Sequence, residues 1–196
     1  MKTAPELQRI VQQIAQKHGL DLDRFGAYLR LQLEGHGHLV MQNLGTAALG
    51  ARISVTHYIQ VASNYVADPQ VVVYNVYRTQ DTSEWTQPVW LPLEITELFG
   101  GWRLYAELDP TGTELLLHDA VGQAELARTC ERIMARNLKR HGWLERGERC
   151  NVPMRSWSQE EIHARDIRVE VLPEHPHDKE NSQRKEGDYG NHEAAA

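Results

Sequence analysis

Three histidines in the first third of the chain are the side chains best suited to chemistry. His36 and His38 flank Gly37, and His57 follows in a later segment. Imidazole titrates near neutral pH and binds transition metals, so each histidine can serve as an acid, a base or a metal ligand. His36, His38 and His57 are therefore the candidate metal ligands, but no carboxylate or cysteine completes a known ligand pattern. A solvent-exposed Gly-His-Gly-His turn is the plainer interpretation, and no cofactor is predicted.

His57 is also the first candidate for a catalytic residue. Tyr58 is adjacent to it and Asp68 follows in a predicted turn, so the three could supply acid and base groups to a small hydrolase or metal-dependent enzyme. His57 nevertheless continues the apolar face of its segment, and no nucleophile–base–orienter triad is visible. The sequence also lacks a G-x-G-x-x-G, P-loop, G-x-S-x-G, H-E-x-x-H or C-x-x-C motif. A histidine bonded within the core is the favoured interpretation.

A ladder of basic residues runs through the predicted second helix. Arg128, Arg132 and Arg136 recur every four residues, so they should line one helical face that continues to Arg140. Such a face could contact the phosphates of a nucleic acid or an acidic protein. Two glutamates in the same segment offset part of the charge. A solvated face is favoured, and nucleic-acid binding through these arginines is kept as an alternative.

Tryptophan is unusually abundant, with five tryptophans against two phenylalanines. Tryptophan fills cores, but in loops it anchors protein interfaces. Trp85 lies in the polar stretch 79–87, Trp90 begins the strand-like segment after it, and Trp157 lies in the C-terminal tail. Trp85 and Trp157 are therefore the favoured interface anchors, and Trp85 and Trp90 are the predicted binding residues for a protein partner.

Residues 53–77 carry His57, Tyr58 and Asp68, and the rest of the chain is organised around them. Residues 53–61 alternate apolar and polar side chains, which is typical of a half-buried strand. Residues 71–74 are a continuous run of β-formers, as in a strand buried on both faces. The Asp68-Pro69 pair has turn chemistry and should join the two strands. The whole segment predicts a long, irregular β-hairpin at the centre of the domain.

The sequences ISVTHY and ADPQVVVY, preceded by HLVMQNLG and followed by WLPLEITELFGGW, resemble a family of small bacterial domains with an "ISVxHY…DP" signature. Such domains are met in plasmids, phages and other mobile elements. The resemblance covers roughly residues 5–107, and it implies a fold and a context but no activity. Many members carry Asn-Gly-Asp in the hairpin, where this chain has Ser63-Asn64-Tyr65.

The flanking segments predict an α+β domain. An amphipathic helix should begin with Thr3 as its cap and Glu6 completing a capping box, and should end at Gly19. A second helix should span residues 123–141, with a buried stripe that includes Ile133. The remaining strand-like segments indicate an antiparallel meander of about five to seven strands, on which the two helices pack.

Length and charge set the domain organisation. Of the 196 residues, 1–146 should form one domain, and 147–196 an acidic, mostly disordered tail that holds 7 basic and 11 acidic residues. The net charge of −6 argues against broad electrostatic attraction to nucleic acid.

Cysteine usage and hydropathy predict the compartment. The two cysteines, Cys130 and Cys150, have neither metal-ligand nor disulfide-framework spacing, as in a reducing cytosol. No apolar run is long enough to cross a membrane. A cytoplasmic, non-catalytic binding module of a mobile element, engaging a protein partner, is the predicted function.

Overall fold

The computed structural model describes residues 1–77 and 88–152. All of them belong to a compact unit, Met1–Arg165, and a second unit, Asp166–Ala196, lies outside the described residues. The predictions for Trp85 and its loop, for Trp157 and for the disordered tail therefore fall largely outside the described residues.

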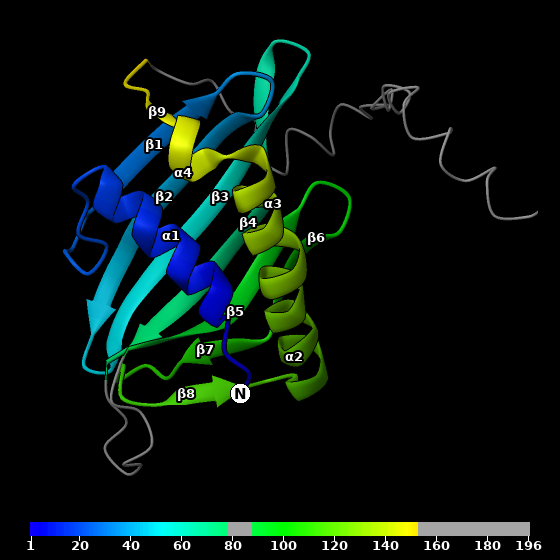
Figure 1. The fold of residues 1–196 in the computed structure, drawn as a ribbon. Helices are drawn as coiled ribbons and strands as arrows, with labels where there is room; N and C mark the ends of the chain where they lie inside the picture. Colours follow the sequence, from blue (N-terminus) through cyan, green and yellow to red (C-terminus); the bar gives the residue numbers. More distant parts are fainter. Residues whose placement is uncertain (78–87, 153–196) are drawn as a thin grey trace, which may run out of the picture. The chain divides into compact units, whose positions relative to one another are not determined.

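A seven-stranded antiparallel sheet forms the body of this unit, with the strand order β6-β5-β4-β3-β2-β1-β9 (Figure 1). Successive strands from β1 to β6 are neighbours, so the predicted antiparallel meander is confirmed. The strands are β1 (Tyr28–Leu33), β2 (Gly37–Ala47), β3 (Gly50–Val61), β4 (Asn64–Val76), β5 (Val89–Glu97), β6 (Gly101–Leu104) and β9 (Glu148–Arg149). A separate pair contains β7 (Ala106–Leu108) and β8 (Leu115–Leu117).

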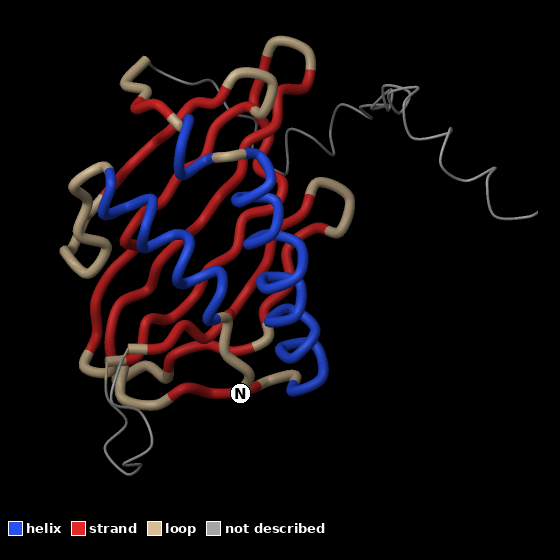
Figure 2. The backbone as a smooth tube through the Cα atoms, viewed as in Figure 1, coloured by secondary structure: helices blue, strands red, loops and turns tan. Residues whose placement is uncertain are grey.

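The helices lie on one face of the sheet, which confirms the α+β class (Figures 1 and 2). They are α1 (Pro5–Lys17), α2 (Ala120–Thr129), the π-helical segment η1 (Cys130–Met134), α3 (Ala135–His141) and α4 (Trp143–Arg146). The segments α2, η1 and α3 follow without a break, and together they form the predicted second helix. None of the helices in the described part of the chain has the length and apolarity required to cross a membrane.

The main core lies between the helices and the sheet. Because side chains alternate along a strand, Ile53 and Val55 of β3 share the helix-covered face with Val71 and Val73 of β4. The helices contribute buried side chains at intervals of three and four residues, as expected of amphipathic helices: Leu7, Ile10, Val11, Ile14, Leu126, Cys130, Met134 and Leu138. A smaller cluster, in which Ala106 of β7 participates, packs around Tyr74 and Leu91.

The central hairpin is organised differently from the prediction. Asp68-Pro69 is not the turn, because β4 runs through it from Asn64 to Val76. The register passes from Thr56↔Gln70 to Tyr58↔Ala67, so two residues of β4 oppose one residue of β3 and form a β-bulge. Proline has no N–H to donate to a ladder, and a bulge is a position where that loss is tolerated.

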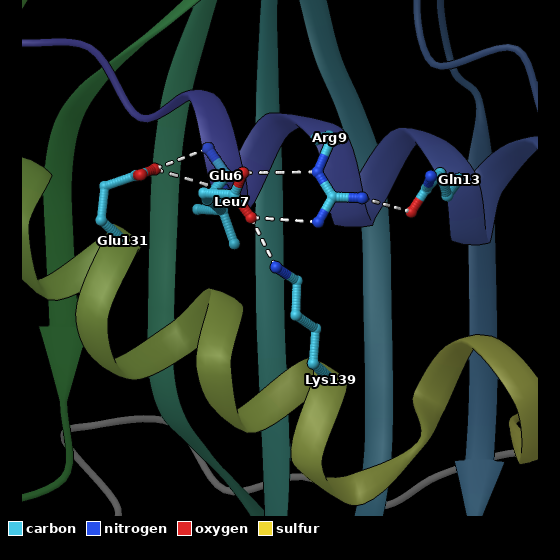
Figure 3. A network of polar contacts seen from close by, with 6 residues as sticks. All are labelled: Glu6, Leu7, Arg9, Gln13, Glu131 and Lys139. Carbon is cyan, nitrogen blue, oxygen red and sulfur yellow. Dashed lines mark hydrogen bonds and ion pairs between the residues drawn. The ribbon is translucent and has the colours of Figure 1, made fainter.

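The predicted capping box of α1 does not form. The N-cap is Ala4, which has no side-chain oxygen, and Thr3 makes no capping bond. The carboxylate of Glu131, in η1, instead accepts hydrogen bonds from the backbone N–H groups of Glu6 and Leu7, at 2.8 and 3.3 Å (Figure 3). Free N–H groups at the start of the first helix therefore find their hydrogen-bond acceptor in the second helix.

The C-terminal end of the sheet lies just past the domain boundary predicted at residue 146. β9 pairs with β1, and the N–H of Cys150 donates to the carbonyl of Arg30 at 3.0 Å. The Arg30 guanidinium in turn donates to the Cys150 carbonyl at 3.1 Å.

Candidate functional site

A narrow groove separates the end of the sheet from η1 and α3, and we call it the η1 groove. Its cavity volume is about 160 Å³. Apolar side chains from both layers line it, with polar side chains among them: Leu39, Pro69, Ile133, Met134, Leu138 and Trp143, with His57, Asp68, Glu97, Thr129, Asn137 and His141. Single π-helical turns are frequent at functional sites, and here one forms part of the wall.

The bulge places His57 and Asp68 at this groove. His57 is the β3 residue that the two residues Asp68 and Pro69 oppose. Its Nε2 lies 2.7 Å from the carbonyl oxygen of His36, so that nitrogen carries the proton and donates. Its ring stands edge-on to Trp143, with 6.0 Å between the ring centroids.

The predicted catalytic set does not converge as a unit. The carboxylate of Asp68 accepts a hydrogen bond from the N–H of Leu98 at 3.1 Å, so it holds the end of β5. Tyr58 pairs with His38 across β2 and β3, and alternation places both on the face opposite His57. Burial raises the pKa of the Tyr58 hydroxyl. Each polar group of this set that reaches the groove is already bonded to a backbone group.

The predicted metal ligands are also separated. His38 lies on the other face of the sheet, edge-on to Tyr65 at 4.5 Å, and burial lowers its pKa. Within residues 1–77 and 88–152, no group of histidine, cysteine and acidic side chains is arranged to hold a metal ion. The structure therefore does not bring the candidate ligands His36, His38 and His57 together as one set.

His141 takes the place in the histidine cluster that His38 was expected to fill. Its ring stacks on His36 with 4.1 Å between centroids and an angle of 17° between planes. Burial lowers the pKa of His141 first, followed by the nearby His36 and His57 and the guanidinium groups of Arg140 and Arg146. This cluster has little signal in the sequence, because His141 is 84 residues from His57 along the chain.

Exposed aromatic side chains mark the edge of the sheet at β6, where Trp102 pairs with Thr96 and therefore lies on the face opposite the groove. Among the described strands β6 pairs only with β5, so its other side is an open edge. Trp102 of β6 is 60% exposed, and Phe99, in the turn that follows Glu97, is 77% exposed. Trp102 is oriented by a hydrogen bond from its Nε1 to the carboxylate of Glu94 at 3.1 Å. We call Phe99 and Trp102 the aromatic edge.

The aromatic edge and Ile133 were missed as binding residues in the sequence. Ile133 lines the η1 groove and is 53% exposed, although the helical wheel placed it in the buried stripe. The available signal was the segment Phe99-Gly100-Gly101-Trp102, in which two aromatic residues flank a glycine turn. Its exposure could not be read from the sequence.

Of the three tryptophans predicted to serve an interface, Trp85, Trp90 and Trp157, only Trp90 lies in the described residues, and it is fully buried. Its backbone N–H donates to the side chain of Gln8, and its carbonyl accepts from the N–H of Ala4. Trp90 thus fixes α1 on β5. Because side chains alternate along β5, that of Trp90 lies beneath the helix, and it cannot contact a partner at the surface.

The predicted arginine ladder lies on the solvent-facing side of the helix. Arg128, Arg132 and Arg136 are exposed, and Arg128 forms an ion pair with Glu125. Arg132 and Arg136 make no ion pair with another described residue. Across residues 120–146 there are six basic and three acidic side chains, so this part of the helical layer is positively charged.

Comparison of the chain with protein-family models, with curated proteins and with solved structures finds no match. The resemblance drawn from the ISVTHY and ADP segments therefore stays a prediction.

Proposed function

We propose that this protein is a non-catalytic binding module that docks a protein partner on the aromatic edge, with the η1 groove, on the helix-covered face behind that edge, as a second contact. The observation that carries this proposal is the exposure of Phe99 and Trp102 on an edge strand. Proteins normally protect such edges with charges, prolines or covering elements, because unpaired strand edges invite pairing with other chains. Large exposed aromatic side chains at an open edge are what a partner-binding surface requires.

The size and lining of the η1 groove favour a protein partner over a small molecule. Its volume of about 160 Å³ is below the range of about 300–1,000 Å³ typical of small-molecule sites. It has room for one apolar side chain, which would contact Ile133 and Leu138. The charged side chains that line the groove are Asp68 and Glu97, whereas Arg132 and Arg136 are exposed on the same helix outside it. The occupant we propose is an extended segment with an apolar anchor in the groove and acidic residues outside it, where they meet the arginines.

Catalysis at His57 receives less support from the geometry. Its Nε2 is held by the His36 carbonyl, and the Asp68 carboxylate is held by the Leu98 N–H. A general base must reach the proton that it removes, and neither group is directed at a shared reaction centre. The location we propose, in the cytoplasm of a bacterium and on a plasmid, phage or other mobile element, rests on the sequence resemblance and the cysteine usage.

The test replaces Phe99 by a photo-crosslinking phenylalanine derivative in the native host, with the same replacement at Phe25 as the matched control. Phe25 is 74% exposed in a different loop, so it reports adventitious contact. A partner captured only from position 99 is then purified and its affinity measured directly. We expect Phe99→Ala and Trp102→Ala each to weaken binding by about tenfold or more, which corresponds to about 1.4 kcal/mol.

Phe25→Ala should leave the affinity unchanged. Equal crosslinking from both positions, or full affinity in Trp102→Ala, would overturn the proposal. If the captured protein is a second copy of this chain, sedimentation analysis should show a dimer that Trp102→Ala dissociates.

A further inference from the structure

The sheet face opposite the helices, which we call the back face, carries a set of buried side chains. Strand alternation identifies them, because Leu31 of β1 and Val55 of β3 belong to the core beneath the helices, and their strand neighbours point the other way. The buried side chains of the back face on β1 to β4 include Arg30, Val40, Ser54, Thr56 and Val72.

Three of these residues form a row across the sheet. Arg30 pairs with Val40, and Val40 pairs with Thr56. The three residues are 8%, 7% and 2% exposed. When one face of an antiparallel sheet is open, its side chains are in contact with water. The middle of the back face is therefore a covered surface.

The described helices and strands do not account for this cover. The described helices lie on the other face of the sheet (Figure 1). β7 packs further along the back face, where Ala106 joins the cluster of Tyr74 and Leu91. Val40 and Val72 belong to neither of the two core clusters that the described residues form. The cover therefore comes from another part of the chain or from another molecule.

The chain that follows β9 starts at this row. The side chain of Arg30 lies on the back face, and its guanidinium donates to the carbonyl of Cys150 at 3.1 Å. The compact unit extends to Arg165, thirteen residues past Val152. Thirteen extended residues span up to about 45 Å. The distance from β1 to β4 is only about 15 Å, since neighbouring strands lie about 4.8 Å apart. The segment 153–165 is thus long enough to cross the row.

We propose that residues 153–165 pack across the back face, with Trp157 as the anchor over Val40 and Val72. Trp157 is the largest apolar side chain of this segment, and a buried tryptophan covers more apolar surface than any other side chain. The same row continues through β4 and β5 to Trp102 of β6, which is exposed. The segment therefore covers the middle of the back face and leaves the aromatic edge free for a partner.

The experiment measures nuclear Overhauser contacts between indole protons and valine methyl groups in the full chain. Trp157→Phe identifies the signals of Trp157. We expect contacts from Trp157 to the methyl groups of Val40 and Val72. A mixture of isotope-labelled and unlabelled chains then identifies the source of these contacts. Contacts within one chain support the proposal, whereas contacts seen only between chains would overturn it, because a second copy would then be the cover.

Urea denaturation gives a second, independent measurement. Trp157→Ala should raise the equilibrium constant of unfolding at least about tenfold, which corresponds to about 1.4 kcal/mol. Tyr189→Ala is the matched control, because Tyr189 is an aromatic residue of the C-terminal tail beyond Arg165, and it should change nothing. Equal stability of these two variants, or the absence of contacts from Trp157 to Val40 and Val72, would overturn the proposal. Phe99→Ala should leave the Trp157 contacts intact, which separates this cover from the docking surface.

Discussion

At the scale of single residues, the position of His57 follows from the bulge between β3 and β4. One residue of β3 faces Asp68 and Pro69, so the strand bends where the groove begins. The hydrogen bond to the carbonyl of His36 then fixes the tautomer, with the proton on Nε2. His141 is the second histidine that lines the groove, and its ring stacks on that of His36. Three histidines thus gather at one end of the helical layer.

The lowered pKa of His141 predicts that the protein is less stable in mild acid. The unfolded chain binds a proton near the ordinary pKa of 6.5, whereas folded His141 binds one only at lower pH. The free energy of unfolding therefore falls as the pH drops from about 7.5 towards about 5.5. His18 and His38 also have lowered pKa values and contribute with the same sign. Urea denaturation across this range should show a smaller fall for His141→Gln than for the unsubstituted chain.

The pH range from about 7.5 to 5.5 distinguishes the effect of the histidines from that of the acidic side chains with lowered pKa values. Glu6 and Asp109 both have pKa values of about 2, so their stabilising contributions are lost only as the pH falls below their ordinary values of 4.5 and 3.8. A fall in stability that is equally steep in His141→Gln would show that the stacked pair is not its source.

At the scale of elements, the long helix explains why Ile133 reaches the surface. A regular helix would place Ile133 in the stripe of Cys130, Met134 and Leu138, as the helical wheel predicted. The π-helical turn η1 changes the phase of the helix within that stripe. Cys130, Met134 and Leu138 remain buried, and Ile133 is displaced to the groove. A local departure from α-geometry therefore exposes the apolar side chain on which the docking proposal partly depends.

The start of the same helix gives a direct test at this scale. Asp119 is the N-cap of α2, and its carboxylate accepts from the N–H groups of Val121 and Gly122. Replacing a capping aspartate by alanine leaves these donors without a partner. We expect Asp119→Ala to lower the free energy of unfolding by about 1 kcal/mol, measured by urea denaturation.

Asp119→Asn is the matched control, because asparagine caps about as well as aspartate. It should retain most of the stability. If both variants lose the same amount, the contribution of Asp119 is its charge near the helix N-terminus rather than its hydrogen bonds.

The elements themselves were largely predictable from the sequence, because they depend on local periodicity. The alternation of residues 53–61 gave β3, and the apolar stripe of residues 7–14 gave α1. The bulge at Asp68-Pro69 was mistaken for a turn, because local chemistry is the same in both cases and only the register distinguishes them. The aromatic edge and the histidine cluster depend on which strand is last in the sheet and on where α3 ends. Neither is encoded within a short window of sequence.

At the scale of the whole molecule, polar contacts join the N-terminal helix to the C-terminal one. Glu6 binds Arg9 within α1 and Lys139 across the helix pair, and Glu131 reaches the first turn of α1 (Figure 3). The side chain of Gln123 in α2 both accepts from the N–H of Lys2 and donates to its carbonyl, each at 2.8 Å. The two helices are far apart in sequence, so these contacts form only when the sheet has brought the ends of the domain together.

The contact of Glu131 with α1 is the part of this network with the clearest energetic consequence. A helix N-terminus has four N–H groups without an intrahelical partner, and a carboxylate there is favoured by hydrogen bonding and by the helix dipole. Because Ala4 cannot cap, Glu131 supplies what a capping side chain would give in most helices. Glu131→Ala should therefore lower the free energy of unfolding by about 1–2 kcal/mol, measured by urea denaturation.

Glu131→Gln keeps one acceptor oxygen and should lose less stability. Thr3→Ala, at the position that the sequence alone marks as the cap, should change stability by no more than about 0.5 kcal/mol. A larger loss in Thr3→Ala than in Glu131→Ala would mean that the first helix is capped locally and that its coupling to the second is only steric.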